Sequence, residues 1–175
     1  MKITAKDIAL IGVYVSLLIA SQFALSAVAG LEFITVLLLC FCYSFGAFRG
    51  CLVATLFSLL RCLFFGFFVN VVVLYLVYYN LFALFFGWLG KRFKGGTTLT
   101  KTVLVVAFAA IFTVCFTLID DLLTPLIFRF SETAWRAYFY ASLYTVIPQT
   151  VFSSISVAVF FVPMTKLFIK IKGKE

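Results

Sequence analysis

Residues 56–68 read LFSLLRCLFFGFF, a run of leucine and phenylalanine with one arginine, Arg61, in its middle. An apolar run of this kind predicts a helix surrounded by lipid or protein, since about 20 apolar residues cross a hydrocarbon core about 30 Å thick. The guanidinium of Arg61 keeps its charge in proteins and costs at least about 2.5 kcal/mol in mid-membrane. We therefore expect Arg61 to have a compensating partner, on another helix or on a bound ligand.

The composition extends this interpretation to the whole chain. Of its 175 residues, 65% are hydrophobic and only 11% are charged, and the mean hydropathy is +1.22. A water-soluble domain of this length has too small an interior for so much apolar surface, which predicts an integral membrane protein. The first apolar segment is followed by several similar ones and by no clear cleavage site, so we interpret it as a membrane span and not as a signal peptide. Residues 1–175 are predicted to form a single membrane domain, with no soluble domain or long linker.

Six apolar stretches predict an all-α integral membrane protein, a bundle of six transmembrane helices. Their expected ranges are 8–27, 33–48, 51–69, 71–89, 102–119 and 137–168. The third and fourth are separated by Asn70, where we predict a tight turn; the alternative is one long hydrophobic hairpin with a different register. The last would be about 48 Å long if continuous, and Pro148 is predicted to interrupt and kink it.

The basic residues predict the orientation of the bundle. With the N-terminus in the cytoplasm, six spans return the C-terminus to the cytoplasm, and 11 of the 14 basic residues then lie inside. Only Arg129 and Arg136 lie outside, and Arg61 lies within a span. This bias is the positive-inside rule, so the net charge of +8 does not call for a nucleic-acid partner. Four of the six acids fall on the outer side: Glu32, Asp120, Asp121 and Glu132.

The first span carries small residues along one face. Gly12, Ser16, Ala20 and Ala24 follow each other at a spacing of four residues. Small side chains let two helices approach closely, and close packing is what drives helix association in lipid. This face is expected either to pack inside the bundle or to dock a separate membrane subunit.

Polar residues line one face of each of the last two spans. The sixth span carries them at helical spacing: Ser142, Thr145, Gln149, Ser153 and Ser156. The fifth ends in Thr113, Thr117 and the Asp120–Asp121 pair. These stripes could form hydrogen bonds between helices. The alternative, which we favour for their outer parts, is that Gln149, Asp120 and Asp121 meet around a cavity.

Arg61 shares a face with the small residues Ala54 and Ser58, so this face is expected to point towards neighbouring helices. Candidate partners are Glu32, Asp120 and Asp121. The pair would be a structural ion pair, or Arg61 would contact an anionic or carbonyl-bearing ligand.

The fourth span contains the sequence VLYLVYYN, which places Tyr78 and Asn80 within the membrane. Tyrosine rings can stack on flat organic ligands, although rings also fill the interior of a bundle. The amide of Asn80 needs hydrogen-bond partners at this depth. Both are candidate substrate-binding residues.

Catalytic and metal-binding motifs are not recognisable in the sequence. There is no histidine, which is the commonest metal ligand and general base. No glycine-rich phosphate loop, GxSxG or HExxH is found. Five cysteines, all in apolar segments, are interpreted as small buried apolar residues. We expect a protein that is not an enzyme and that holds no cofactor or metal.

In size, in its six spans with both ends inside, and in its basic N-terminus before a small-residue first helix, the chain resembles the S components of energy-coupling factor vitamin transporters. The AGLEF segment and the basic tail add to the resemblance. The family's AxxxA pattern is matched by Ala20 and Ala24, while Ser16 departs from it.

The resemblance implies a multi-pass protein of the cell membrane that binds a vitamin near the outer surface. Its first helix would dock on a membrane coupling subunit, which two cytoplasmic ATPases drive. Seven positions fall in the implied ligand zone: Glu32, Asn70, Asp120, Asp121, Arg136, Tyr140 and Gln149. The alternatives are a six-span scaffold of the cell-shape type and a stand-alone facilitator.

Overall fold

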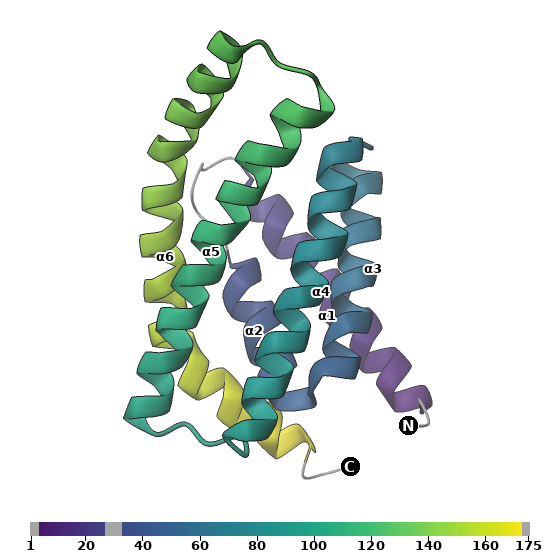
Figure 1. Ribbon diagram of the computed structural model, residues 1–175. Coiled ribbons are helices and arrows are strands. Elements are labelled where there is room, and N and C mark those ends of the chain that lie inside the picture. Colours follow the sequence, from purple (N-terminus) through teal and green to yellow (C-terminus); the bar gives the residue numbers. More distant parts are fainter. Residues whose placement is uncertain (1–3, 27–32, 173–175) are drawn as a thin grey trace.

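The computed structural model describes residues 4–26 and 33–172, and these form six α-helices. Their bounds are α1 Ala5–Leu25, α2 Ile34–Phe45, α3 Ala47–Phe65, α4 Val69–Arg92, α5 Leu99–Ile127 and α6 Glu132–Lys172. The helices alternate in direction, so that α1 begins and α6 ends at the same end of the bundle (Figure 1). We call this the terminal end and the opposite one the far end. The prediction of an all-α bundle is confirmed for the described residues.

Five of the helices, all except α2, are long and apolar enough to cross a membrane. The helix α2 has 12 residues, every one of them buried, and is about 18 Å long. It lies inside the bundle, in contact with α1, α3, α4 and α6. The second predicted span, 33–48, is therefore a short central helix that the other helices enclose.

The boundary between α2 and α3 is a glycine. Gly46 has a φ of 90° and separates the two helices, a conformation that costs a glycine little because it has no Cβ. The predicted break between residues 48 and 51 is therefore wrong. Gly50 lies inside α3, where a Cβ would come within 2.6 Å of the Cys42 Sγ atom, so the absence of a side chain allows α3 to pack against α2.

A second glycine separates α3 from α4. Gly66 has a φ of 102°, and the turn comprises residues 66–68. Asn70 lies in the first turn of α4, so the prediction of a turn at Asn70 is wrong. The two helices form the expected pair, but the residue that reverses the chain is the glycine.

The helix α6 is continuous over 41 residues and contains both Pro148 and Pro163. The predicted interruption at Pro148 is therefore wrong. Proline removes one backbone donor, and hydrogen bonds to α5 hold the helix on both sides of Pro148. Ser142 donates to Asp121 at 2.6 Å before it, and Thr113 donates to Ser153 at 3.1 Å after it.

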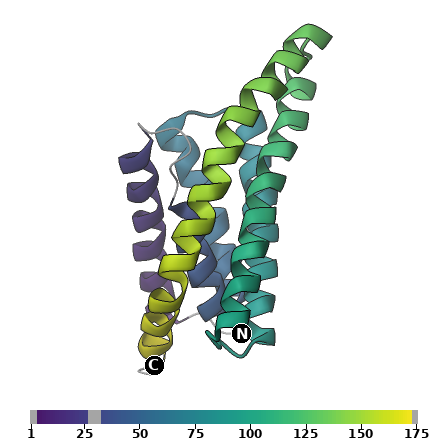
Figure 2. The ribbon, with the colours of Figure 1, turned by 90° about the vertical axis from the view of Figure 1, so that its left-hand side faces the viewer.

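At about 62 Å, α6 is roughly twice as long as the hydrocarbon core is thick. Together with α5 it forms a hairpin that projects beyond the other helices at the far end (Figures 1 and 2). The final turns of α6, drawn in yellow, pass beneath the bundle at the terminal end.

Candidate functional site

A chain of hydrogen bonds joins α4, α5 and α6 at the far end. The Asn70 amide donates to the Thr124 Oγ1 atom at 2.9 Å. Thr124 donates to one carboxylate oxygen of Asp120 at 2.8 Å, and the Tyr138 hydroxyl donates to the other at 2.7 Å. Asn70 and Asp120, which lie 50 positions apart in the sequence, thus belong to one network, and we call these four residues the far-end network.

Asp121 is buried beside this network, with 3% of its surface exposed. One carboxylate oxygen accepts a hydrogen bond from Ser142 at 2.6 Å, and its carbonyl accepts one from the Trp135 indole at 3.1 Å. The other carboxylate oxygen is buried with no partner among the described residues, as is the Asn70 carbonyl oxygen. A buried acceptor without a donor costs about 1–3 kcal/mol, so each of these oxygens has an unused capacity to accept a hydrogen bond.

The outer parts of the polar stripes of α5 and α6 line one groove, while Thr113 and Ser153 from their inner parts are hydrogen-bonded to each other. This groove has a volume of about 290 Å³. Its lining includes Thr117 and Asp120 from α5 and Ser142, Thr145 and Gln149 from α6. The predicted meeting of Asp120 with Gln149 is therefore seen, with Phe116 supplying an aromatic wall. Asp121, the third residue of that prediction, is not part of the groove lining and accepts a hydrogen bond from Ser142 instead.

Arg61 contacts aromatic rings. Its guanidinium carbon lies 4.1 Å from the centre of the Tyr75 ring and 5.3 Å from that of Phe65. Such cation–π contacts stabilise a cation by about 0.5–2 kcal/mol. The predicted ion pair with Asp120 or Asp121 is not formed: within the described part of the chain the ion pairs are Asp7–Arg49 and Glu132–Arg136. The third candidate partner, Glu32, lies outside the described residues.

Tyr78 and Asn80 join neighbouring helices, and the Tyr78 ring packs behind the groove wall, with its centre 4.7 Å from that of the Phe116 ring. The Tyr78 hydroxyl donates to the Phe112 carbonyl of α5 at 3.0 Å. The Asn80 amide nitrogen donates to Thr55 of α3 at 3.1 Å and to the Leu76 carbonyl at 2.8 Å. These contacts supply the partners that an amide within a membrane needs. Both residues therefore hold the bundle together and are not part of the groove lining.

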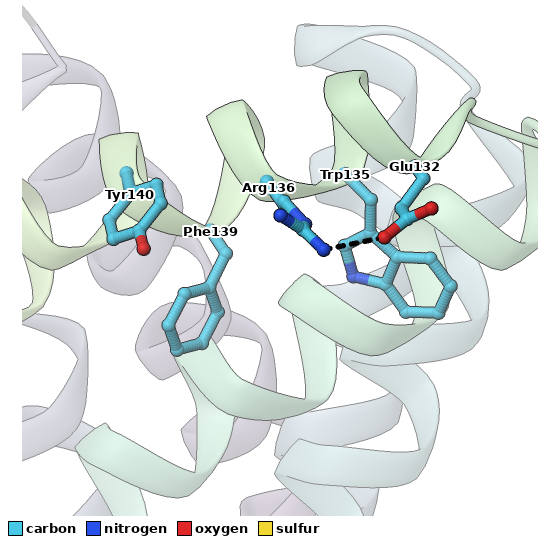
Figure 3. Close-up of a pocket in the computed structure, with 5 residues that line it drawn as sticks. All are labelled: Glu132, Trp135, Arg136, Phe139 and Tyr140. Carbon is cyan, nitrogen blue, oxygen red and sulfur yellow. Dashed lines mark hydrogen bonds and ion pairs between the residues drawn. The ribbon is translucent and has the colours of Figure 1, made fainter.

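Arg136 and Tyr140 lie on a different face of α6. With Glu132, Trp135 and Phe139 they line a separate shallow hollow of about 330 Å³ (Figure 3). Arg136 is 2.6 Å from Glu132, and both side chains are largely exposed. The structure does not bring Arg136 or Tyr140 to Asp120 and Gln149.

The small-residue face of α1 lies on the surface of the bundle. Gly12, Ser16, Ala20 and Ala24 are all exposed, and a Cβ on Gly12 would have nothing within 4 Å. The opposite face of α1 is the one that packs into the core: Ile11, Tyr14, Val15 and Leu18 are buried. Within the described residues, the small-residue face is not covered by another helix.

The same face forms one side of an apolar groove of about 750 Å³ between α1 and α3. Ser16, Ala20 and Ala24 line it from α1, and Leu60 and Phe64 line it from α3. Small side chains therefore form one wall of this groove, which leaves room for a further apolar helix.

Two members of the far-end network, Thr124 and Tyr138, were not predicted as site residues. Thr124 continues the Thr113, Thr117, Asp121 series at spacings of four, four and three, so a longer stripe would have included it. Tyr138 has an aromatic ring typical of a membrane interface, and only the structure places its hydroxyl on Asp120. No group of three His, Cys, Asp or Glu residues could hold a metal in the part of the chain that the structure describes.

Comparison of the chain with protein-family models, with curated proteins and with solved structures gave no match.

Proposed function

We propose that the protein is the substrate-binding S component of an energy-coupling factor transporter in the cell membrane. It would bind a vitamin or related micronutrient at the outer side and deliver it together with a membrane coupling subunit and two cytoplasmic ATPases. The observation that carries the proposal is the exposed small-residue face of α1. Four small residues, spaced by four along one exposed helix face, favour close approach of a helix from another protein.

The proposed orientation follows from the charges at the two ends. Lys91, Lys94 and Lys172 lie where α4 and α6 end, at the terminal end. By the positive-inside rule this end faces the cytoplasm. The far end then faces outwards, with the far-end network and the groove of Asp120 and Gln149 open to incoming ligand. In this arrangement the chain crosses the membrane six times, and α2, too short to span the hydrocarbon core alone, forms only part of its crossing.

The unpaired oxygens indicate the chemistry of the ligand. Asn70 and Asp121 each present a buried acceptor without a partner among the described residues, and Asp120 lines the adjacent groove. A ligand with N–H or O–H donors, or with a positive charge, complements these oxygens. The ring of Phe116 in the groove wall suits a flat heterocycle.

Ligand binding is tested by identifying what the protein carries and what stabilises it. The protein is purified in detergent, co-purifying small molecules are identified by mass spectrometry, and thermal unfolding is followed with a panel of vitamins. We expect one compound to raise the unfolding midpoint. For Asp121→Asn, the ligand concentration that gives the same rise in midpoint should be at least about tenfold higher. A protein that arrives empty and responds to no vitamin is not an S component, and a scaffold of the cell-shape type becomes the better assignment.

Docking is tested by bulky substitutions on the small-residue face. Ala20→Trp and Ala24→Trp are expected to abolish assembly with a purified module of coupling subunit and ATPases, because a Trp side chain fills the groove in which the partner helix lies. The matched control is Ala107→Trp, an exposed alanine on α5, which should assemble normally. Assembly of all three variants would contradict the docking role, and uptake by the protein reconstituted alone would identify a facilitator.

A further inference from the structure

The terminal end carries a hollow that the proposed function does not use. It has a volume of about 660 Å³ and lies where the α2–α3 junction, the end of α4 and the end of α6 come together. Three lysines line it, Lys91, Lys94 and Lys172, and none of the described lining residues is acidic. The hollow is therefore strongly positive, which favours an anionic occupant.

Neutral hydrogen-bond donors add to this charge. Ser44 lines the hollow and is 8% exposed, and its hydroxyl oxygen is buried with no partner in the described part of the chain. Ala47, also in the lining, is the first residue of α3, whose N-terminus has no side-chain cap. The backbone N–H groups of this first turn give the helix end a partial positive charge.

Lys172 fixes the position of the last turn of α6 at the hollow. Its ammonium group donates to the Ser44 carbonyl at 3.2 Å, which places a cation at the C-terminal end of α2, where it is favourable. Lys91 and Lys94 make no such contact within residues 4–26 and 33–172, and both are exposed. Two cations are therefore available to a ligand while the third holds the site together.

An apolar surface leads away from the hollow along α4. Trp88 belongs to the lining and is 56% exposed. Leu84 and Leu81, both exposed, follow on the same helix face at spacings of four and three. Tryptophan is enriched where lipid headgroups meet the hydrocarbon core. The positive hollow at the end of the bundle and the apolar surface along α4 therefore match the headgroup and the acyl chain of a lipid molecule.

We propose that the hollow binds the phosphate headgroup of an anionic phospholipid. The phosphate lies between Lys91, Lys94 and the Ser44 hydroxyl, and one acyl chain follows Trp88, Leu84 and Leu81 along α4. The proposal does not depend on the function proposed above, since it uses the opposite end of the bundle from the far-end network.

The test measures lipid binding by the full chain in detergent. Phosphatidylglycerol and phosphatidylcholine with identical acyl chains are titrated, and bound lipid is counted by native mass spectrometry. We expect phosphatidylglycerol to bind more tightly and to raise the thermal unfolding midpoint. A basic residue near an anionic lipid surface contributes about fivefold in affinity, so Lys91→Gln/Lys94→Gln should weaken this binding on the order of 10- to 30-fold.

The matched control is Lys166→Gln/Lys170→Gln. It removes two exposed lysines of α6 that do not line the hollow, and phosphatidylglycerol binding should stay within about twofold of the parent protein. Ser44→Ala, which keeps every charge, should weaken the binding a few-fold.

Three results would overturn the proposal. Equal loss in the two double variants would assign the binding to diffuse positive charge. Equal affinity for the two phospholipids would remove the role of the headgroup. Inorganic phosphate or glycerol 3-phosphate that stabilises the protein as much as the phospholipid does would show that the occupant is a soluble phosphate. If the Lys91/Lys94 variant fails to fold, Ser44→Ala decides between binding in the hollow and binding elsewhere.

Discussion

The guanidinium of Arg61 lies 4.1 Å from the centre of the Tyr75 ring, an arrangement that keeps a cation inside an apolar helix. The electron-rich face of the ring replaces part of the hydration that the cation loses. Because Tyr75 belongs to α4 and Arg61 to α3, the contact also joins the two helices.

A double-mutant cycle measures this contact. Arg61→Met and Tyr75→Leu are each expected to lower the free energy of unfolding, and their combination should cost less than the sum by about 0.5–2 kcal/mol. The measurement is equilibrium unfolding in mixed detergent micelles. Additive effects would show that the ring does not stabilise the cation.

Asp120 holds the far-end network together because it accepts hydrogen bonds from Thr124 and Tyr138. Asp120→Ala leaves both hydroxyls without their acceptor, and the free energy of unfolding should fall by about 1–3 kcal/mol. The control is Glu132→Ala, whose ion pair with Arg136 is exposed at both ends and should change stability by less than about 1 kcal/mol. A loss of equal size in the two variants would mean that the network does not stabilise the far end.

At the scale of the helices, α4 packs against α2 through a glycine. A Cβ on Gly90 would come within 2.1 Å of the Tyr43 carbonyl oxygen. Gly90→Ala is therefore expected to push the two helices apart and lower the free energy of unfolding by about 1–3 kcal/mol. Gly12→Ala is the matched control: a Cβ there meets nothing within 4 Å, so the variant should be at least as stable as the parent, since alanine is favoured over glycine in helices. Thermal unfolding of both variants checks the contrast.

The apolar runs predicted helices close to those observed, while the boundaries depended on backbone geometry that hydropathy does not report. Arg49 illustrates the difference. It falls between the predicted spans 33–48 and 51–69, yet it lies in the first turn of α3 and pairs with Asp7 of α1 at 2.6 Å. The chain reverses instead at Gly46 and Gly66, whose positive φ values only the structure shows.

The sequence predicted the candidate site correctly where residues recur at helical spacing. It did not predict which neighbouring element each helix face would meet. Asp120 and Gln149 face one groove as their stripes predicted. Arg136 and Tyr140 belong to the same stretch of α6 but line another hollow (Figure 3), because a few residues along a helix change the face by a large angle. The contact of Arg61 with the Tyr75 ring carries no charge pattern in the sequence, because an aromatic ring can lie near a cation without an acidic residue at helical spacing.

At the scale of the whole molecule, the positions of the helix ends predict which loops face each side of the membrane. In a variant without its native cysteines, Glu132→Cys should react with a membrane-impermeant maleimide in intact cells, because α6 begins at the far end. Lys94→Cys, in the α4–α5 connection at the terminal end, should react only after the membrane is permeabilised. The reverse pattern would invert the orientation and place the groove of Asp120 and Gln149 in the cytoplasm.

The enclosed helix α2 has a consequence for the biosynthesis of the protein. Its ring contacts with α6, such as Tyr43 with Phe161 at 4.9 Å and Phe45 with Phe168 at 5.6 Å, join residues more than 110 positions apart. A ribosome that makes about 5–20 residues per second needs several seconds to supply these partners. Until then α2, too short to cross the bilayer by itself, lacks one side of its enclosure. The bundle is therefore completed only after α6 has left the ribosome, and a chain that ends before α6 leaves a buried helix exposed to quality control.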